Sequence, residues 1–485
     1  MRWQRRYVSH QYHRECPPDS SATTQLRLWC IQIPLIGIPS MITAAEAIPN
    51  NLTTEVLYSK SREVIDGLKR HGVNVVSYAC DGTQVERSVQ DLLVARATSR
   101  ISYTIPDPED HCKHEIQIPM YRLSPIVMIQ DSKHAAKTMR NNVFAGSRVP
   151  TLGNNVAMYP YAHDMAFSTL PSCPLFHRDV VKLDRQDDNA ATRLFSAAAL
   201  DFVTKQFPDR LGFIAYLFVM GEIVDAYQSR TVSHVERIKM VLRCRYFLRL
   251  WKRFLKAGEY TESKHYISRE ADDILDTLID GLIGLVYVYR DHLGGERYPL
   301  LLWLHSTEIC EHVFAECRKL VKDFSHLNFL YMTAQLHVLI RAASSFSKGT
   351  DPKAQAMGYS HSHLDPENAC VETLATYPTD GEIALAVGEA WDEAVALWGL
   401  LGIQVDDMPV SPASGSTKMS PSAPDPDELD SVECPGEETE AATLQNLISV
   451  QQTPGWKEVD SETQDRMHML TCAAVSLEIE ERRSL

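Results

Sequence analysis

The hydrophobic pattern of this chain changes near Gly153, and that change limits the folds open to it. Before Gly153, short β-rich runs alternate with segments of helical periodicity. Such alternation is typical of an α/β unit, in which helices cover a sheet. The expected strands are residues 26–33, 40–45, 73–78 and 125–129, and the expected helices are residues 53–71, 86–97 and 132–142.

After Gly153 the pattern is almost entirely helical, because apolar residues recur at the spacing of one helix face. The sequence therefore predicts an α/β core over residues 26–153, an all-helical insertion over residues 154–300 and a helical completion of the core over residues 301–403. The protein is expected to be mainly helical overall. The expected helices are residues 190–207, 211–228, 233–255, 269–289, 303–346 and 380–401.

Negative charge is concentrated near the end of the chain. The formal net charge is −15, and residues 404–485 hold 17 Asp or Glu against 5 Lys or Arg, a net of −12 that leaves −3 for residues 1–403. The tail is also rich in Pro and Ser, so we expect it to be disordered and acidic. Residues 1–25 are expected to be irregular. The near-neutral body argues weakly against broad nucleic-acid affinity, because phosphate contacts need clustered Lys and Arg.

The cysteines and the apolar runs indicate an intracellular protein without a membrane segment. The 11 cysteines are dispersed and form no C-x-x-C pair, which favours reduced thiols. No apolar signal-peptide core follows the basic first residues. The most apolar run, residues 281–289, is far shorter than the roughly 20 residues that span a bilayer. The sequence also lacks a P-loop, a Rossmann glycine motif and a nucleophile elbow.

Two acidic residues are expected at strand-to-helix junctions. Asp81 and Asp131 each follow a predicted strand, where an α/β sheet presents catalytic groups. The alternatives are a turn-forming Asp-Gly pair for Asp81 and a helix N-cap for Asp131. Lys133 and Lys137 share a face of the following helix, from which they would contact phosphates.

A second pair of acids lies on one predicted helix. Glu308 and Glu311 are three residues apart and therefore share a face. Because two like charges on one face repel each other without a nearby cation, the pair is a candidate metal-facing motif. The alternative is a solvated helix face, which the apolar neighbours of the pair weaken.

Residues 235–256 form the most basic helical stretch of the chain. Its Lys and Arg residues alternate with apolar ones. Three interpretations are open: a DNA-facing helix, an amphipathic helix that binds a partner, and a basic solvated face.

The order of these motifs resembles that of the P-element-type (THAP-associated) DDE transposases and the host proteins derived from them. The resemblance extends over residues 26–343 and includes a helical block between the motifs. Its motifs are a strand-end Asp-Gly-Thr, an Asp-x-x-His-x-x-Lys-x-x-Arg-Asn run and a Thr-Glu-x-x-Glu-x-x-Phe turn. The residues are Asp81, Gly82 and Thr83; Asp131, His134, Lys137, Arg140 and Asn141; and Thr307, Glu308, Glu311 and Phe314.

The resemblance implies an RNase H-like core interrupted by a helical insertion. In that family three acids bind two divalent metal ions, Mg²⁺ or Mn²⁺, for in-line displacement during DNA cleavage and strand transfer. By position, Asp81 matches the second acid and Glu311 the third, so both would bind metal, with Glu308 as a supporting acid. Asp131 and His134 match a structural or substrate-orienting motif.

The resemblance also implies partners and a location. DNA would be the partner, with Lys133, Lys137 and Arg140 as contacts. A homo-oligomer and a nuclear location are further expectations of the resemblance.

One departure from the family pattern changes the expected activity. The first catalytic Asp should lie on a strand before residue 26, where Asp19 is the only Asp. It follows two prolines, which a central strand does not tolerate. We therefore expect a transposase-derived chain whose metal-dependent DNA cleavage is weak or absent. The alternatives are a non-enzymatic DNA- or protein-binding module that keeps the fold, and an unrelated helical scaffold.

Overall fold

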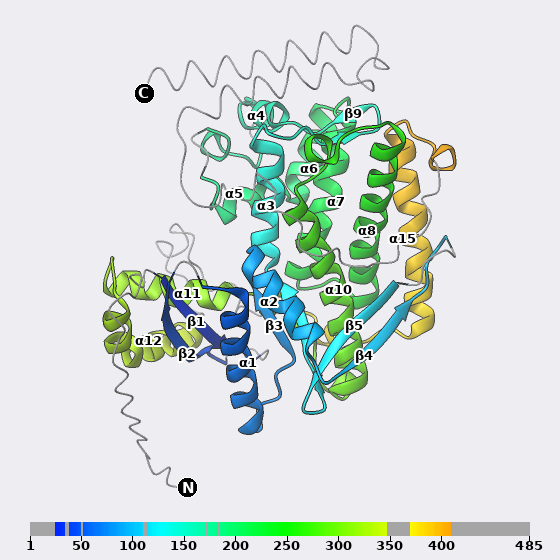
Figure 1. The fold of residues 1–485 in the computed structure, drawn as a ribbon. Helices are drawn as coiled ribbons and strands as arrows, with labels where there is room; N and C mark the ends of the chain where they lie inside the picture. Colours follow the sequence, from blue (N-terminus) through cyan, green and yellow to red (C-terminus); the bar gives the residue numbers. More distant parts are fainter. Residues whose placement is uncertain are drawn as a thin grey trace.

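The structure is a computed structural model that describes residues 25–33, 38–49, 52–109, 114–170, 172–181, 184–346 and 369–408. The predictions made for the first 24 residues and for the acidic tail beyond residue 408 lie outside this part of the chain. A hairpin, α1 and two later helices lie on one side of the molecule, and a body of long helices lies on the other (Figure 1).

The described strands form four small sheets and not one continuous sheet. Within the described residues the structure is mainly helical, as predicted, but the RNase H-like core implied by the resemblance is not confirmed. The sheets are β1 (Gln25–Ile31) with β2 (Met41–Ile48), β3 (Ser77–Cys80) with β7 (Val127–Gln130), β4 (Ser99–Ile105) with β5 (His114–Tyr121) and β6 (Ser124–Pro125), and β8 (Thr151–Leu152) with β9 (Asn155–Val156).

The parallel ladder of β3 and β7 places two strand ends side by side. Ser77 lies opposite Val127, and Cys80 lies opposite Gln130. The strand predicted over residues 73–78 is observed about three residues later, as β3, because its ladder forms opposite the short apolar run of β7. Each strand leads into a helix, α2 (Gln84–Ala95) and α3 (Ser132–Phe144) respectively.

The hairpin of β4 and β5 was not expected from the sequence. Ile101 and Ile118 face each other across its antiparallel ladder. Ile105, Ile116 and Ile118 are buried in the main apolar core, whereas alternate residues are exposed. This two-residue alternation is the strand signal that the sequence offered.

The helices match the predicted ones closely where a single face is buried. Two predicted helices are each divided in two. Residues 190–207 form α5 and α6, separated by Ser196, whose hydroxyl caps α6; residues 303–346 form α11 and α12. The main helices are α1 (Thr54–Arg70), α4 (Tyr159–Ala166), α5 (Asp188–Leu194), α6 (Ala197–Gln206), α7 (Leu211–Gln228), α8 (His234–Ala257), α10 (Arg269–His292), α11 (Glu308–Leu320), α12 (His326–Phe346), α14 (Val371–Ala375) and α15 (Asp380–Leu400).

The long helices α7, α8, α10 and α15 run side by side and enclose most of the apolar core (Figure 1). By length and composition α7 is apolar enough to cross a membrane, but 67% of it is buried inside the structure. A single helix of this kind is weak evidence for a membrane span, since core helices have the same composition. The limits predicted for the insertion and for the two core segments remain predictions.

The basic helix α8 lies inside the protein, and most of its cations have internal partners. Arg249 pairs with Asp107 at 2.6 Å, and Arg253 pairs with Glu109 at 2.7 Å. Arg237 is fully buried and donates to backbone carbonyls. The paired cations of α8 therefore stabilise internal contacts, which none of the three sequence interpretations anticipated. The other pairs are Arg243–Glu222, Arg245–Asp280 and Lys252–Asp272.

Helix α10 crosses β7 at very close range. A Cβ atom at Gly281 would lie 2.9 Å from the carbonyl oxygen of Met128 and 2.5 Å from a methyl carbon of Ile129. Glycine is therefore the residue that allows this approach. The contact supports the strand that ends immediately before Asp131.

Candidate functional site

Asp81 and Asp131 lie at the same edge of the parallel ladder. They follow the paired residues Cys80 and Gln130, and the backbone N–H of Asp131 donates to the carbonyl of Cys80 at 3.0 Å. Each acid directly follows a strand, as expected from the sequence, and the register of the ladder also places the two strand ends side by side. The two acids differ in exposure: Asp131 is buried, whereas Asp81 is exposed.

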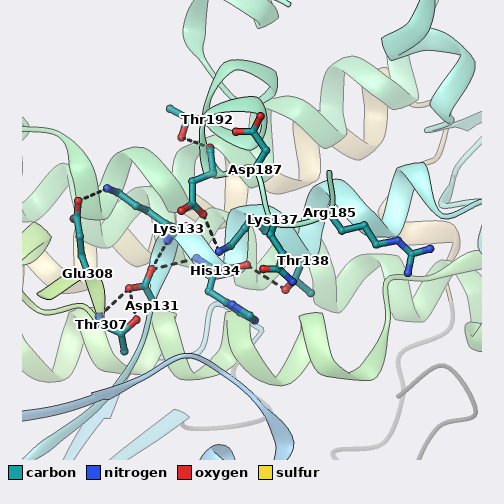
Figure 2. Close-up of polar contacts among 12 residues, drawn as sticks. Asp131, Lys133, His134, Lys137, Thr138, Arg185, Asp187, Thr192, Thr307 and Glu308 are labelled. Carbon is teal, nitrogen blue, oxygen red and sulfur yellow. Dashed lines mark hydrogen bonds and ion pairs between the residues drawn. The ribbon is translucent and has the colours of Figure 1, made fainter. Parts of the chain in front are cut away.

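The carboxylate of Asp131 joins α3 to the start of α11. One oxygen accepts from the backbone N–H groups of Lys133 at 2.8 Å and His134 at 3.1 Å, which is an N-cap. The other accepts from the backbone N–H and the hydroxyl of Thr307, both at 2.8 Å (Figure 2). Capping was the alternative interpretation of Asp131, and the contact with Thr307 adds a link across 176 residues.

Glu308 forms the next contact between the same two helices. Its carboxylate pairs with the ammonium of Lys133 at 2.6 Å, and the ring of His312 lies 3.4 Å from the same oxygen. Glu308 is buried. Burial would lower the pKa of Lys133, but the attraction of Glu308 raises it above its usual value. Glu308, which the resemblance gives as a supporting acid, is thus the ion-pair partner of Lys133 in this structure.

Glu311 lies among other acids on the outer side of α11. Enclosure by the surrounding protein, together with the charges of Asp131, Asp188 and Glu308, raises its pKa to about 7, and Lys137 opposes that rise. The residue as a whole is still exposed to solvent. Because neighbouring negative charges oppose its ionisation, this carboxyl would gain from a bound cation.

The Asp81 turn packs against His134. Gly82 has a φ of +90°, and a Cβ at this position would lie 2.9 Å from the side-chain oxygen of Gln130 and 3.3 Å from a ring carbon of His134. Asp81 itself accepts a 3.4 Å bond from the backbone N–H of Thr83. The Asp-Gly turn that was the alternative interpretation of Asp81 is present, and it brings the first motif beside the second.

The three cations predicted to contact DNA have intramolecular partners. Lys133 pairs with Glu308 as described above, and Lys137 pairs with Asp188 at 2.9 Å. Arg140 is 1% exposed and donates to the backbone carbonyl of Asp187 at 3.0 Å. In this conformation Arg140 has no surface to present to a nucleic acid, so the prediction that it contacts DNA is not carried further.

Two residues of this region were not assigned a role from the sequence. Asp188, at the start of α5, had no motif to single it out. His305 is buried between the hydroxyls of Ser77 at 2.8 Å and Tyr289 at 3.3 Å. Burial lowers the pKa of His305 to about 4, so the ring is neutral near pH 7 and ties β3 to α10. The position of His305 beside the Glu308 motif was the only sequence signal that pointed to this residue.

The carboxylates gathered here do not fit a two-metal centre. Asp131 is saturated by four hydrogen bonds, and Glu308 is paired with a lysine. Asp81 and Glu311 are the exposed acids that remain among the predicted ones. Within the described part of the chain, no group of three or more His, Cys, Asp or Glu side chains is arranged to hold a metal ion. The Mg²⁺ or Mn²⁺ requirement therefore stays a prediction.

Replacing Glu311 by Gln is expected to stabilise the protein at alkaline pH and to have no effect at acidic pH. A carboxyl whose folded-state pKa is raised binds its proton more tightly in the folded state, so the wild type loses stability as the pH rises from about 4.5 to about 7. The variant with the neutral Gln side chain does not lose this stability as the pH rises. Thermal unfolding midpoints measured from pH 4 to pH 8 should diverge in that window and stay apart above it.

Glu382→Gln is the control of opposite sign. Hydrogen bonds from the backbone and hydroxyl of Thr379 lower the pKa of Glu382. Stability from this carboxylate is present above its ordinary pKa, so the control variant should be the less stable one at pH 8. Equal midpoints for the Glu311 variant and the wild type at every pH would contradict the assignment.

Comparison with known proteins gives one distant likeness. No family model and no curated protein matches the chain. A solved structure described as the Drosophila P element transposase strand transfer complex matches with 14% sequence identity, over 62% of this chain and 67% of that chain, with a TM-score of 0.44. A likeness of this extent carries no argument about fold or chemistry by itself.

Proposed function

We propose that this chain derives from a P-element-type transposase and that two acids beside its former catalytic pair, Asp131 and Glu308, now hold the fold together. The order of the sequence motifs supports the ancestry. The observation that carries the proposal is the carboxylate of Asp131, which accepts from its own helix and from Thr307 at once. Motifs separated by 176 residues thus meet at one strand edge, as a common site requires.

Metal-dependent DNA cleavage and strand transfer would be the ancestral chemistry, and we propose that this chain performs it weakly or not at all. A two-metal site needs carboxylates that are free to bind cations on both sides of the reacting phosphate. The resemblance assigns metal binding to Asp81 and Glu311 and finds no first acid to join them, while the neighbouring Asp131 and Glu308 are engaged by backbone N–H groups and by Lys133.

Binding without cleavage is the function that remains for the retained fold, and DNA is the ligand that the resemblance suggests. Lys133 keeps 30% of its side-chain surface exposed, whereas Lys137 keeps only 9%. Few cations are available near the site, so DNA binding should be weak, with the shallow salt dependence of a small number of phosphate contacts. A nuclear location and self-association belong to the same proposal and rest on the resemblance alone.

The test is Mn²⁺-dependent nicking of supercoiled DNA by the purified full chain. We expect wild type and Glu311→Gln to show the same background rate, because Glu311 has no complete set of partner ligands. Glu372→Gln, an exposed acid on α14, is the matched control. A wild-type rate well above background that falls at least tenfold in Glu311→Gln alone would overturn the non-catalytic proposal.

DNA binding by the same samples separates the remaining interpretations. Measurable affinity at low salt that falls between 50 and 200 mM salt, as expected for a small number of phosphate contacts, supports a DNA-binding module. Affinity that is absent even at low salt removes DNA from the proposal and leaves a protein-binding module or an unrelated helical scaffold.

A further inference from the structure

Helix α12 is apolar on two opposite faces. Its inner face packs against β1 and α11 in one apolar cluster and is at most 8% exposed; the residues are Phe329, Met332, Leu336 and Ile340. Its outer face carries large apolar side chains that are between 53% and 80% exposed, namely Leu327, Leu330, Tyr331 and Val338. No other helix in the described part of the chain exposes as many large apolar residues.

These exposed residues form a continuous stripe. With the exposed Ala334 they recur every three or four residues, so at about 3.6 residues per turn they lie within about a third of the helix circumference. The stripe is directly opposite the buried face, and α12 lies on the side of the molecule away from the long helices (Figure 1). Because a helix that is apolar all round is normally buried, the stripe indicates a surface that a partner covers.

The charge of α12 distinguishes between possible partners. The helix contains no Asp, Glu or Lys, and Arg341 is its one Arg. Such a surface offers DNA no cluster of phosphate contacts. For the same reason it has little attraction for the acidic residues 404–485 of this chain. A second copy of the stripe is apolar as well, and it meets no like charge as long as the two Arg341 side chains are kept apart.

We propose that two copies of this protein associate through α12, with the two helices antiparallel. A twofold axis between Tyr331 and Ala334 sets Tyr331 of each copy against Ala334 of the other. Leu327 and Val338 are equally far from this axis, so they also face each other. The largest side chain of the stripe thus meets the smallest one. A parallel pair would instead set Tyr331 against Tyr331 and Arg341 against Arg341.

The ends of the stripe favour the same direction. In the antiparallel pair, Arg341 of each copy lies at the level of the exposed Asp323 of the other, in the turn before α12. Lys322 is adjacent, and exposed ion pairs contribute little, so this contact selects the direction more than it adds affinity. The proposal gives a surface to the self-association mentioned above, and it does not depend on transposase ancestry.

Sedimentation velocity of the full chain over a hundredfold range of concentration is the experiment. One helix face is smaller than the roughly 800 Å² per partner of a standard interface, so we expect a weak dimer that dissociates on dilution. Leu330→Lys should weaken the dimer at least about tenfold, because it places a charge in the apolar contact. Val338→Lys, at the other end of the stripe, should have the same effect.

Leu385→Lys is the matched control. Leu385 is 64% exposed on α15, outside the stripe, so this variant should dimerise as the wild type does. Circular dichroism confirms that each variant is folded, which is expected because the replaced side chains are exposed.

Two charge variants test the direction of the helices. Arg341→Glu should weaken the antiparallel dimer, since the new carboxylate lies near Asp323, and adding Asp323→Lys should restore much of the loss. In a parallel pair, Arg341→Glu would instead leave the dimer unchanged or strengthen it, and that result would overturn the antiparallel arrangement.

Other results would overturn the proposal as a whole. A wild type that stays monomeric at every concentration does so, and so does a dimer that persists in both Leu330→Lys and Val338→Lys. If Leu330→Lys lowers the thermal unfolding midpoint of a monomeric chain and Leu385→Lys does not, another segment of the same chain covers the stripe. None of these results bears on the non-catalytic proposal, which the nicking assay decides.

Discussion

Replacing Asp131 by Ala is expected to lower the free energy of unfolding by about 3 to 5 kcal/mol. The substitution removes the N-cap of α3 and leaves the N–H and hydroxyl of Thr307 without their acceptor at a site that is only 3% exposed. A lost cap costs about 1 kcal/mol, and each of the two partly buried donors of Thr307 left unpaired costs about 1 to 2 kcal/mol. Chemical denaturation of the full chain measures the total.

Two milder variants divide this effect into its parts. Asp131→Asn keeps an oxygen for the N-cap but turns an amide N–H₂ toward the donors of Thr307, so its cost should be intermediate. Thr307→Val removes the hydroxyl bond alone and should cost about 1 kcal/mol. A cost for Asp131→Ala no larger than that for Thr307→Val would show that the link between α3 and α11 does not stabilise the fold.

Replacing Gly281 by Ala is expected to destabilise the protein by about 2 to 4 kcal/mol, although Ala is the better helix former. The added Cβ would meet the carbonyl oxygen of Met128 at 2.9 Å, and a backbone atom in a strand moves less readily than a side chain. Helix α10 would have to shift away from β7, which opens the core on both sides of the contact. Thermal and denaturant unfolding both report the change.

Gly388→Ala is the matched control on a helix without such a contact. Gly388 lies inside α15, and no atom is within 4 Å of a Cβ added there. The helix propensity of Ala should stabilise the control variant by up to about 1 kcal/mol. The two substitutions are chemically identical and should have opposite signs. If both variants were more stable than the wild type, the close packing of α10 on β7 would be refuted.

The fold could be predicted from the sequence where one element's own pattern decides its structure. The long apolar run of α7 places both of its ends at the predicted residues, and α10 begins where predicted. The break between α11 and α12 was not predicted, because the apolar spacing continues across residues 321–325. The β4–β5 hairpin was missed for a related reason, since its alternating residues are few and its turn carries polar side chains.

The candidate site was predicted only in part, because its residues come from distant segments. The positions of Asp81 and Asp131 at strand ends followed from local patterns and are correct. The hydrogen-bond and ion-pair partners of the acids in this site did not follow from local patterns. No local sequence pattern predicts that Thr307 donates hydrogen bonds to Asp131, or that Lys133 forms an ion pair with Glu308. The basic stretch of α8 was misjudged in the same way, since the acids that neutralise it lie elsewhere in the chain.

The bond between Asp131 and Thr307 also has a consequence for the order of folding. It closes a loop of 176 residues that contains α7, α8 and α10. Closing so long a loop costs entropy that a few polar contacts do not recover before the intervening chain is compact. The body of long helices should therefore assemble first, and α11 should pack later against the ends of β3 and β7. The acids that resemble a catalytic centre would then be brought together only in the final step of folding.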